Sequence, residues 1–212
     1  MNHDARDPIS ASIFESPVDE LLHPELAIWR ANVGVPIALD LSPPPRERLN
    51  GLDVLRWNVA VGAGRLHKLI ERVRRGLIEL PRQGTAVAGA AGKRGLDAFG
   101  TDPRRPLVLL LQEAYRADET VPAAARGRYH GGAKHPRAAD DVADVARAFG
   151  LSLRYAPSMR NGAHRSDRGN AILSALPLGM SHAFVLPHVR QRRVVVSAEL
   201  EGIQDLAVMS VH

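Results

Sequence analysis

The feature that most constrains the fold is a continuous apolar run, Pro106 to Leu111, that stops abruptly at Gln112 and Glu113. Apolar and polar residues do not alternate along it, so neither side of a strand formed here suits contact with water. Such a run is typical of a strand that is buried on both faces. It therefore predicts a strand inside a sheet that is covered on both sides.

The segments around this run first alternate between strand and helix patterns. Residues 52–57 form a short apolar strand pattern, while 65–80 and 140–149 carry apolar residues at helical spacing. Further strands are predicted at 151–155, 170–174, 181–186, 193–200 and 203–211, the last two joined through Glu201-Gly202 as a hairpin. This order favours an α/β fold with a mixed sheet or sheets and helices packed outside.

The length of 212 residues and a hydrophobic content of 45% favour one domain with extensions over two domains. Residues 1–50 have no sustained period and end near Ser42-Pro43-Pro44-Pro45, a stiff spacer. We interpret residues 1–50 as an N-terminal extension and linker, and residues 51–212 as the domain.

The sequence contains no cysteine, which excludes disulfides and thiolate metal sites and suits a reducing compartment. Any metal ion must therefore be held by oxygen or imidazole ligands. The N-terminus lacks an apolar stretch of signal length, and nowhere do 18 apolar residues follow one another. We expect a cytoplasmic protein without a membrane span.

The net charge of +5 and the isoelectric point near 10.2 are compatible with a polyanionic partner such as nucleic acid. Of the 28 basic residues only three are lysines, and coding bias would also produce such an arginine excess. The basic side of the 65–80 helix is typical of a solvated face. A non-catalytic polyanion-binding module is nevertheless the alternative function that this composition leaves open.

Two arginines, Arg192 and Arg193, stand directly before the apolar run 194–196. A guanidinium beside a buried strand needs hydrogen-bond acceptors. We expect at least one of them to fold back over the sheet and to pair with a carboxylate or with backbone carbonyls.

Three polar residues stand where predicted strands end: Asn58, Glu113 and His212. Side chains at strand ends sit on rigid elements and still reach the rim of a fold, as metal ligands and acid/base groups require. Each of them alone is more typical of an ordinary surface residue. Their combination is what indicates a site.

Four segments resemble, in order and approximate spacing, the successive motifs of the endonuclease/exonuclease/phosphatase superfamily. This superfamily includes pancreatic deoxyribonuclease, abasic-site endonucleases, neutral sphingomyelinases and inositol-phosphate phosphatases. The resemblance covers residues 52–212. The segments are Leu55-Arg-Trp-Asn58, Leu111-Gln-Glu113, Gly169-Asn-Ala-Ile-Leu-Ser174 and Met209-Ser-Val-His212.

The resemblance implies a two-sheet α/β sandwich with helices on the outer faces and a site at one end. It implies that Glu113 binds Mg²⁺ or Mn²⁺ with the amide oxygen of Asn58 beside it, since hard oxygens suit hard cations. It further implies that Asn170 hydrogen-bonds near the phosphate and that His212 contacts the scissile phosphate. The expected activity is hydrolysis of a phosphate ester or phosphodiester, and nucleic acid, phospholipid and soluble phosphate esters all remain open as substrates.

The sequence departs from the family pattern in two places. Ala175 stands where the family often has a basic residue, and the chain ends at His212, before the Asp-x-Asn and Asp-His motifs. We therefore expect an incomplete domain that lacks most of its second sheet, leaves the inner face of the first exposed, folds poorly and shows no meaningful Mg²⁺-dependent hydrolysis. A third interpretation is that another chain supplies the missing half.

Overall fold

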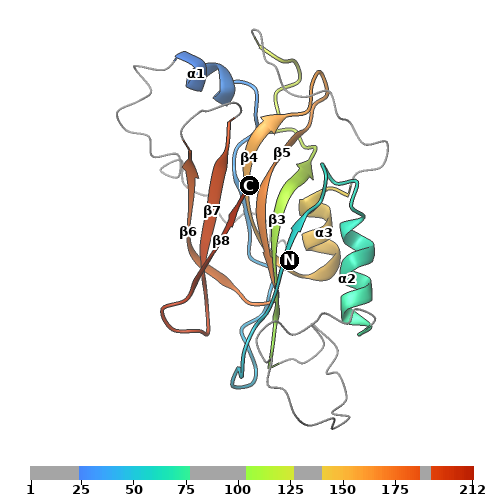
Figure 1. The fold of residues 1–212 in the computed structure, drawn as a ribbon, viewed down its shortest axis with the longest axis vertical. Helices are drawn as coiled ribbons and strands as arrows, with labels where there is room; N and C mark the ends of the chain where they lie inside the picture. The colour runs from blue at the N-terminus through green and yellow to red at the C-terminus, as the bar shows by residue number, and fades with distance from the viewer. Residues whose placement is uncertain (1–23, 77–103, 127–139, 187–191) are drawn as a thin grey trace, which may run out of the picture.

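The computed structural model describes residues 24–76, 104–126, 140–186 and 192–212. Within them the strands form a five-stranded sheet, ordered β1-β4-β5-β3-β2, and a three-stranded sheet, ordered β6-β7-β8. The sheets face each other, and α2 and α3 cover the far side of the larger one (Figure 1). The elements are α1 (Pro24–Arg30), β1 (Ile37–Leu39), β2 (Asp53–Asn58), α2 (Leu66–Arg74), β3 (Leu107–Arg116), α3 (Val142–Phe149), β4 (Ser152–Arg160), β5 (Asp167–Ser174), β6 (Leu178–Val185), β7 (Val194–Leu200) and β8 (Ala207–Val211).

The strand β3 is the centre of the fold, as the apolar run predicts. It pairs in parallel with β2 and antiparallel with β5. Leu109 and Leu111 pack with α2 and α3, whereas Val108 belongs to the core between the sheets, and all three are fully buried. Burial on both faces is confirmed, and this places the end of β3 between two layers.

Helix α3 begins and ends for identifiable reasons. Asp141 accepts hydrogen bonds from the N–H groups of Ala143 and Asp144 at the start of α3, and Gly150 ends the helix in the left-handed region at φ 61°. The helix predicted at 65–80 is observed as Leu66–Arg74, and residues 77–80 lie outside the described part. Among the described residues no helix is both long and apolar enough to cross a membrane.

The expectation of an exposed inner face on the first sheet is wrong for the described residues, because the three-stranded sheet lies against it. The inward side chains of β7, Val194, Val196, Ala198 and Leu200, are at most 2% exposed. They pack against Val108 and Ile172 of the larger sheet, so three strands suffice to cover it. The exposed apolar side chains lie elsewhere.

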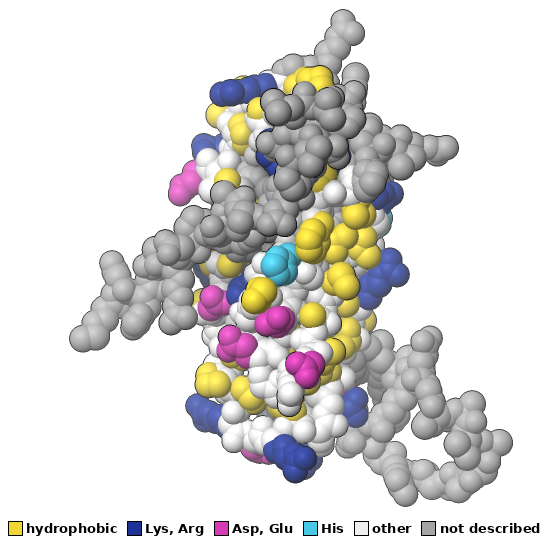
Figure 2. Space-filling view, turned by 90° about the vertical axis from the view of Figure 1, so that its left-hand side faces the viewer, with side chains coloured by type: hydrophobic (Ala, Val, Ile, Leu, Met, Phe, Trp, Pro, Cys, Tyr) yellow, Lys and Arg dark blue, Asp and Glu magenta, His cyan; other side chains and the backbone are white. Residues whose placement is uncertain are grey.

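Four of the eight large apolar side chains that are exposed among the described residues lie on the outer face of β6–β8. Figure 2 shows this face, with hydrophobic side chains gathered beside a histidine. The cross-strand register places His182 of β6 and Met209 of β8 on either side of Ser197, and Phe184 and Val211 on either side of Val195. The most exposed members are Met180, Met209, Val211 and Phe184, at 63%, 61%, 44% and 42%.

The described part of the predicted N-terminal extension belongs to the fold and is not a separate appendage. Leu26, Trp29 and Val33 are buried in the core between the sheets, and β1 pairs antiparallel with β4 as an edge strand. Because β1 gains its order from pairing with β4 and not from an internal period, the sequence pattern did not reveal it. Residues 1–23 lie outside the described part.

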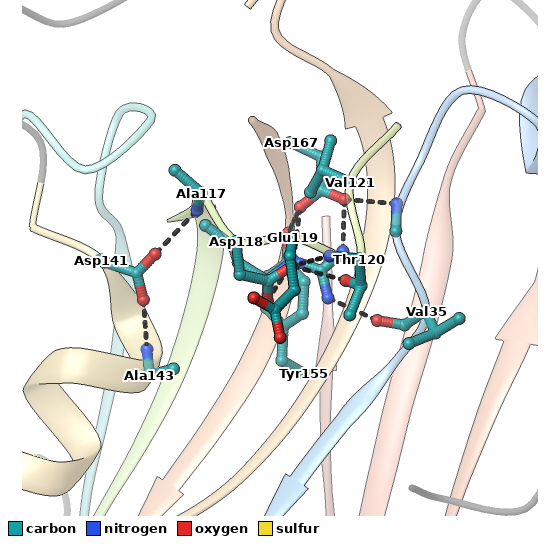
Figure 3. A network of polar contacts seen from close by, with 12 residues as sticks. Val35, Ala117, Asp118, Glu119, Thr120, Val121, Asp141, Ala143, Tyr155 and Asp167 are labelled. Carbon is teal, nitrogen blue, oxygen red and sulfur yellow. Dashed lines mark hydrogen bonds and ion pairs between the residues drawn. The ribbon is translucent and has the colours of Figure 1, made fainter. Parts of the chain in front are cut away.

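A buried polar network ties this segment to the end of the larger sheet. The carboxylate of Asp167 on β5 accepts hydrogen bonds from Arg116, from the Tyr155 hydroxyl at 2.6 Å and from the Gly34 N–H at 2.8 Å. Figure 3 shows Asp167 and Tyr155 converging there, with the Val35 carbonyl, which also accepts from Arg116, at one side. Arg116, Tyr155 and Asp167 are fully buried.

Arginines also fix the loop that follows β3. Arg160 donates to the Pro122 carbonyl at 2.6 Å, and Arg165 donates to the Val121 carbonyl at 2.9 Å.

Arg192, before β7, donates to the Leu186 carbonyl at 3.3 Å, and its guanidinium lies over the Trp29 ring. The prediction that one of the two arginines before β7 folds back onto backbone carbonyls is therefore confirmed.

Candidate functional site

The site begins where two parallel strands end side by side. Asn58 is the last residue of β2, and in the parallel register it lies opposite Gln112 of β3. The Val59 N–H continues the pairing by donating to the Gln112 carbonyl at 2.9 Å. Neighbouring parallel strands present their carboxyl ends at one edge, which brings Asn58 beside Glu113.

A β-bulge then turns Glu113. The pairing of β3 with β5 shifts between Leu111 and Ala114, and Glu113 adopts φ 53°, in the left-handed region. Bulges re-aim side chains at the ends of strands and are enriched beside functional sites. A left-handed glutamate costs free energy that a glycine would avoid, and backbone strain of this kind is enriched at functional sites.

The second sheet contributes His212, the residue after β8. Ser210 of β8 donates to the Leu111 carbonyl at 2.8 Å, and Gln112 donates to the Ser210 hydroxyl at 3.3 Å. These two hydrogen bonds connect β8 with the bulge of β3. They hold the end of one sheet against the end of the other.

Three side chains from three strand ends meet as a result. Asn58 Nδ2 lies 3.4 Å from Glu113 Oε1 and 3.4 Å from His212 Nε2. His212 Nδ1 lies 3.9 Å from Glu113 Oε1, and the side chains of His212 and Glu113 are 35% and 29% exposed. We expect Asn58, Glu113, Asn170 and His212 to converge on one rim, and the structure brings three of them, Asn58, Glu113 and His212, into contact.

The orientation of Asn58 differs from the expected one. Its Oδ1 accepts a hydrogen bond from the Ala60 N–H at 2.9 Å, so its amide nitrogen, not its oxygen, faces Glu113. Ala60 and Val61 both have positive φ, at 48° and 60°, and the turn that they form fixes this arrangement. In this structure Asn58 is a donor to the carboxylate and to the imidazole.

Asn170 lies on β5 opposite the bulge, between the Leu111–Ala171 and Ala114–Gly169 pairs. It is 3% exposed and donates through Nδ2 to the Val194 carbonyl at 2.6 Å. Its neighbour along the chain, Gly169, lies so close to β4 that an added Cβ would stand 1.9 Å from the Ala156 carbonyl oxygen. Asn170 is thus beside the site in the sheet, and its contact with a phosphate stays a prediction.

The donor set at the site is small for Mg²⁺ or Mn²⁺. Among the described residues no group of three or more histidine, aspartate or glutamate side chains could hold a metal ion. Mg²⁺ is commonly bound through one or two carboxylates together with substrate phosphates and several waters. Glu113, whose side chain is 29% exposed, fits the single-carboxylate end of that range, and phosphate and water oxygens would supply the other ligands.

Sequence reasoning missed Ser210 and Gln112 as residues that form the site. Both are buried, at 1% and 3%, and both interrupt apolar strands. A lone polar residue within a buried strand is the available signal, because such a group must find a hydrogen-bond partner.

No family model and no curated protein matches this sequence. The fold is similar to a solved structure described as an endonuclease/exonuclease/phosphatase from Beutenbergia cavernae. The two chains share 16% sequence identity with a TM-score of 0.39, and the match covers 75% of this chain and 37% of the solved one. The chain thus spans little more than a third of the length of that solved structure.

Proposed function

We propose that this chain carries part of the site of a divalent-metal-dependent phosphoesterase, with Glu113 as a ligand of Mg²⁺ or Mn²⁺. The observation that supports the proposal is the meeting of Asn58, Glu113 and His212 at 3.4–3.9 Å from three strand ends in two sheets. These are the same residues that the ordered sequence motifs single out. The substrate is a phosphate ester, with nucleic acid as one candidate.

Each side chain has a task that its chemistry permits. The Glu113 carboxylate supplies the anionic oxygen, and Asn58 restricts its orientation by donating to Oε1. His212, which is partly exposed, can donate a hydrogen bond to a phosphate oxygen at the rim. A bound divalent cation would neutralise charge on the phosphate oxygens during attack by water.

Metal binding is the first test of this proposal. We expect Mn²⁺ to bind the 212-residue chain weakly, measured by the loss of free Mn²⁺ signal in electron paramagnetic resonance. Glu113→Gln should abolish this binding because it removes the negative charge and keeps the shape. The matched control is Glu199→Gln on the exposed side of β7, which should bind Mn²⁺ as the unchanged chain does. Equal Mn²⁺ binding by Glu113→Gln would eliminate the ligand role.

Hydrolysis is the second test, with bis(p-nitrophenyl) phosphate as the substrate. Glu113 is the carboxylate that contacts Asn58 and His212 in the described part of the chain, and a single carboxylate should hold a metal ion weakly, so we expect turnover near background from the 212-residue chain. A longer natural chain carrying Asp-x-Asn and Asp-His motifs should turn over in Mg²⁺ or Mn²⁺, lose activity in EDTA and depend on Glu113. Robust EDTA-sensitive turnover by the 212-residue chain would place the catalytic centre elsewhere.

The alternative, a non-catalytic polyanion-binding module, draws on the exposed basic residues of α2 and its flanks. These are Arg65, Lys68, Arg72 and Arg75. Arg116, Arg160 and Arg165 are instead engaged with carbonyls or carboxylates, so they add little to a binding surface. Salt-dependent binding of duplex DNA that Glu113→Gln leaves intact, together with no Mn²⁺ binding, would favour this alternative.

A further inference from the structure

We infer that Ser210 and Gln112 are positioning residues that set His212 against Asn58 and Glu113. This inference deepens the proposed function and rests on it, because the positioning matters only if Glu113 and His212 act at a phosphate site. The geometry that carries it is the polar bridge between the two sheets: Ser210 Oγ donates to the Leu111 carbonyl and accepts from Gln112 Nε2. Neither residue needs to touch substrate or metal for this task.

The pattern of β8 shows how specifically Ser210 is placed. Ser210 is the buried residue of this strand, at 1%, whereas Ala207, Met209 and Val211 are exposed. Side chains alternate along a strand, so Ser210 and His212 project to the same side, toward β3. The direction of the His212 side chain is therefore tied to the contact that Ser210 makes.

The other end of the bridge reaches the bulge that turns Glu113. Gln112 is adjacent to Glu113, is 3% exposed, and donates both to the Ser210 hydroxyl and to the Leu110 carbonyl at 3.1 Å. One pair of buried polar side chains thus fixes the backbone on both sides of the site. A displacement of β8 along β3 would break these bonds before it could move His212 away.

Stability alone does not require this bridge. The contact between the sheets already buries the inward residues of β7 against Val108 and Ile172. An alanine at position 210 would remove the hydroxyl from a buried place and leave that apolar contact intact. Buried polar pairs of this kind contribute more to register than to stability in several systems, and that is the role that we assign here.

The experiment measures the contact that is being positioned, without metal or substrate. In the metal-free 212-residue chain, an NMR cross-relaxation signal between protons of the Asn58 side-chain amide and of the His212 ring reports the proximity of these groups, whose Nδ2 and Nε2 atoms lie 3.4 Å apart. A loosening of about 1 Å, the scale at which an unsupported site fails, lowers this signal about fivefold because it falls with the sixth power of distance. We expect that loss in Ser210→Ala and recovery in Ser210→Thr, which restores the hydroxyl.

The control and the second variant keep the inference open to refutation. Ser197→Ala makes the same change on β7 and should leave the signal unaltered. If Ser210→Ala does not fold, Gln112→Met removes the donor at similar volume and should weaken the signal severalfold. An unchanged signal in the folded variant, or no signal in the unaltered chain, overturns the positioning role. Failure of the proposed function appears separately, as absent Mn²⁺ binding in the unaltered chain with the signal present.

Discussion

Two polar clusters each include one residue of strand β3, Arg116 in the first and Glu113 in the second. They differ in burial and in the length of their hydrogen bonds. At Arg116 the partners Asp167 and Tyr155 are fully buried, and the Asp167 carboxylate accepts hydrogen bonds from Arg116, Tyr155 and Gly34. At Glu113 the contacts are 3.4 and 3.9 Å long, and the side chain is 29% exposed.

The difference indicates a structural role for the Asp167 cluster and is consistent with the binding role that we propose for Glu113. Buried polar groups with every partner in place specify the fold, because any loss leaves a desolvated charge. A carboxylate has about four acceptor positions, and Glu113 uses one of them weakly, so capacity for a ligand remains. The Asp167 cluster should therefore govern stability, and the Glu113 cluster should govern binding.

The largest effect is expected from Asp167→Ala. It removes the buried carboxylate that pairs with Arg116, leaving only the more distant Asp118 at 3.7 Å, and should destabilise the fold by about 3–5 kcal/mol, measured by urea unfolding. Glu113→Ala is the matched change, an acidic residue replaced by alanine on the neighbouring strand β3. It should alter the free energy of unfolding by at most about 0.5 kcal/mol. Similar costs for the two variants would break the comparison.

Tyr155→Phe tests the same cluster through pH. Burial, followed by the charge of Asp167, raises the pKa of Tyr155 well above its ordinary value. The unfolded tyrosine ionises near pH 10, so this group's contribution to stability is complete below about pH 10 and is lost as pH rises toward the folded pKa, by about 1.4 kcal/mol per pH unit.

Two results are expected from that variant. At pH 7 Tyr155→Phe should cost about 1.5–3 kcal/mol, because a hydrogen bond to a charged group is lost. Above about pH 10 the gap between the unaltered chain and the variant should narrow. Urea midpoints from pH 7 to pH 11 measure both. A gap that stays constant across this range would show that Tyr155 titrates alike in the folded and unfolded chains.

Gly34→Ala asks whether the N-terminal segment is part of this cluster. A Cβ at Gly34 would stand 1.9 Å from Arg116 Nη2 and 2.7 Å from Thr120 Oγ1, so crowding should cost about 1–3 kcal/mol. Gly51→Ala is the control, because its Cβ would meet nothing closer than Arg105 at 3.8 Å. That variant should be neutral or slightly stabilising, and equal thermal midpoints for both would remove Gly34 from the cluster.

Of the two clusters, the sequence predicted the one around Glu113, because that cluster depends on where strands end. Asn58 and Glu113 could be placed together because consecutive strands of a β-α-β unit pair in parallel and end at one edge. His212 could be joined to them only through the motif resemblance, since nothing local relates β8 to β3. The orientation of the Asn58 amide depends on the Ala60 turn and was not predictable from residue types.

The cluster around Asp167 could not be predicted, because its residues are far apart in the sequence. Arg116 and Asp167 are 51 positions apart, and Gly34 and Asp167 are 133 apart. A charge pair at such separations leaves no periodic signal in a sequence rich in arginine. The same holds for the Ser210–Gln112 bridge and for β1, whose order comes from tertiary packing and not from local propensity.

The smallest effect, and the sharpest for the site, is expected from Glu113→Gly. Its left-handed φ of 53° costs a glutamate roughly 1–2 kcal/mol that glycine avoids, partly offset by the greater freedom of an unfolded glycine, so stability should rise by about 0.5–1 kcal/mol. Mn²⁺ binding should disappear at the same time.

Asp205→Gly is the matched control, because Asp205 has φ 56° in the turn before β8 and lies outside the site. It should gain the same stability and keep Mn²⁺ binding. If Glu113→Gly instead destabilises the chain in urea unfolding, the glutamate contributes to the fold as Asp167 does, and the distinction between the two clusters fails.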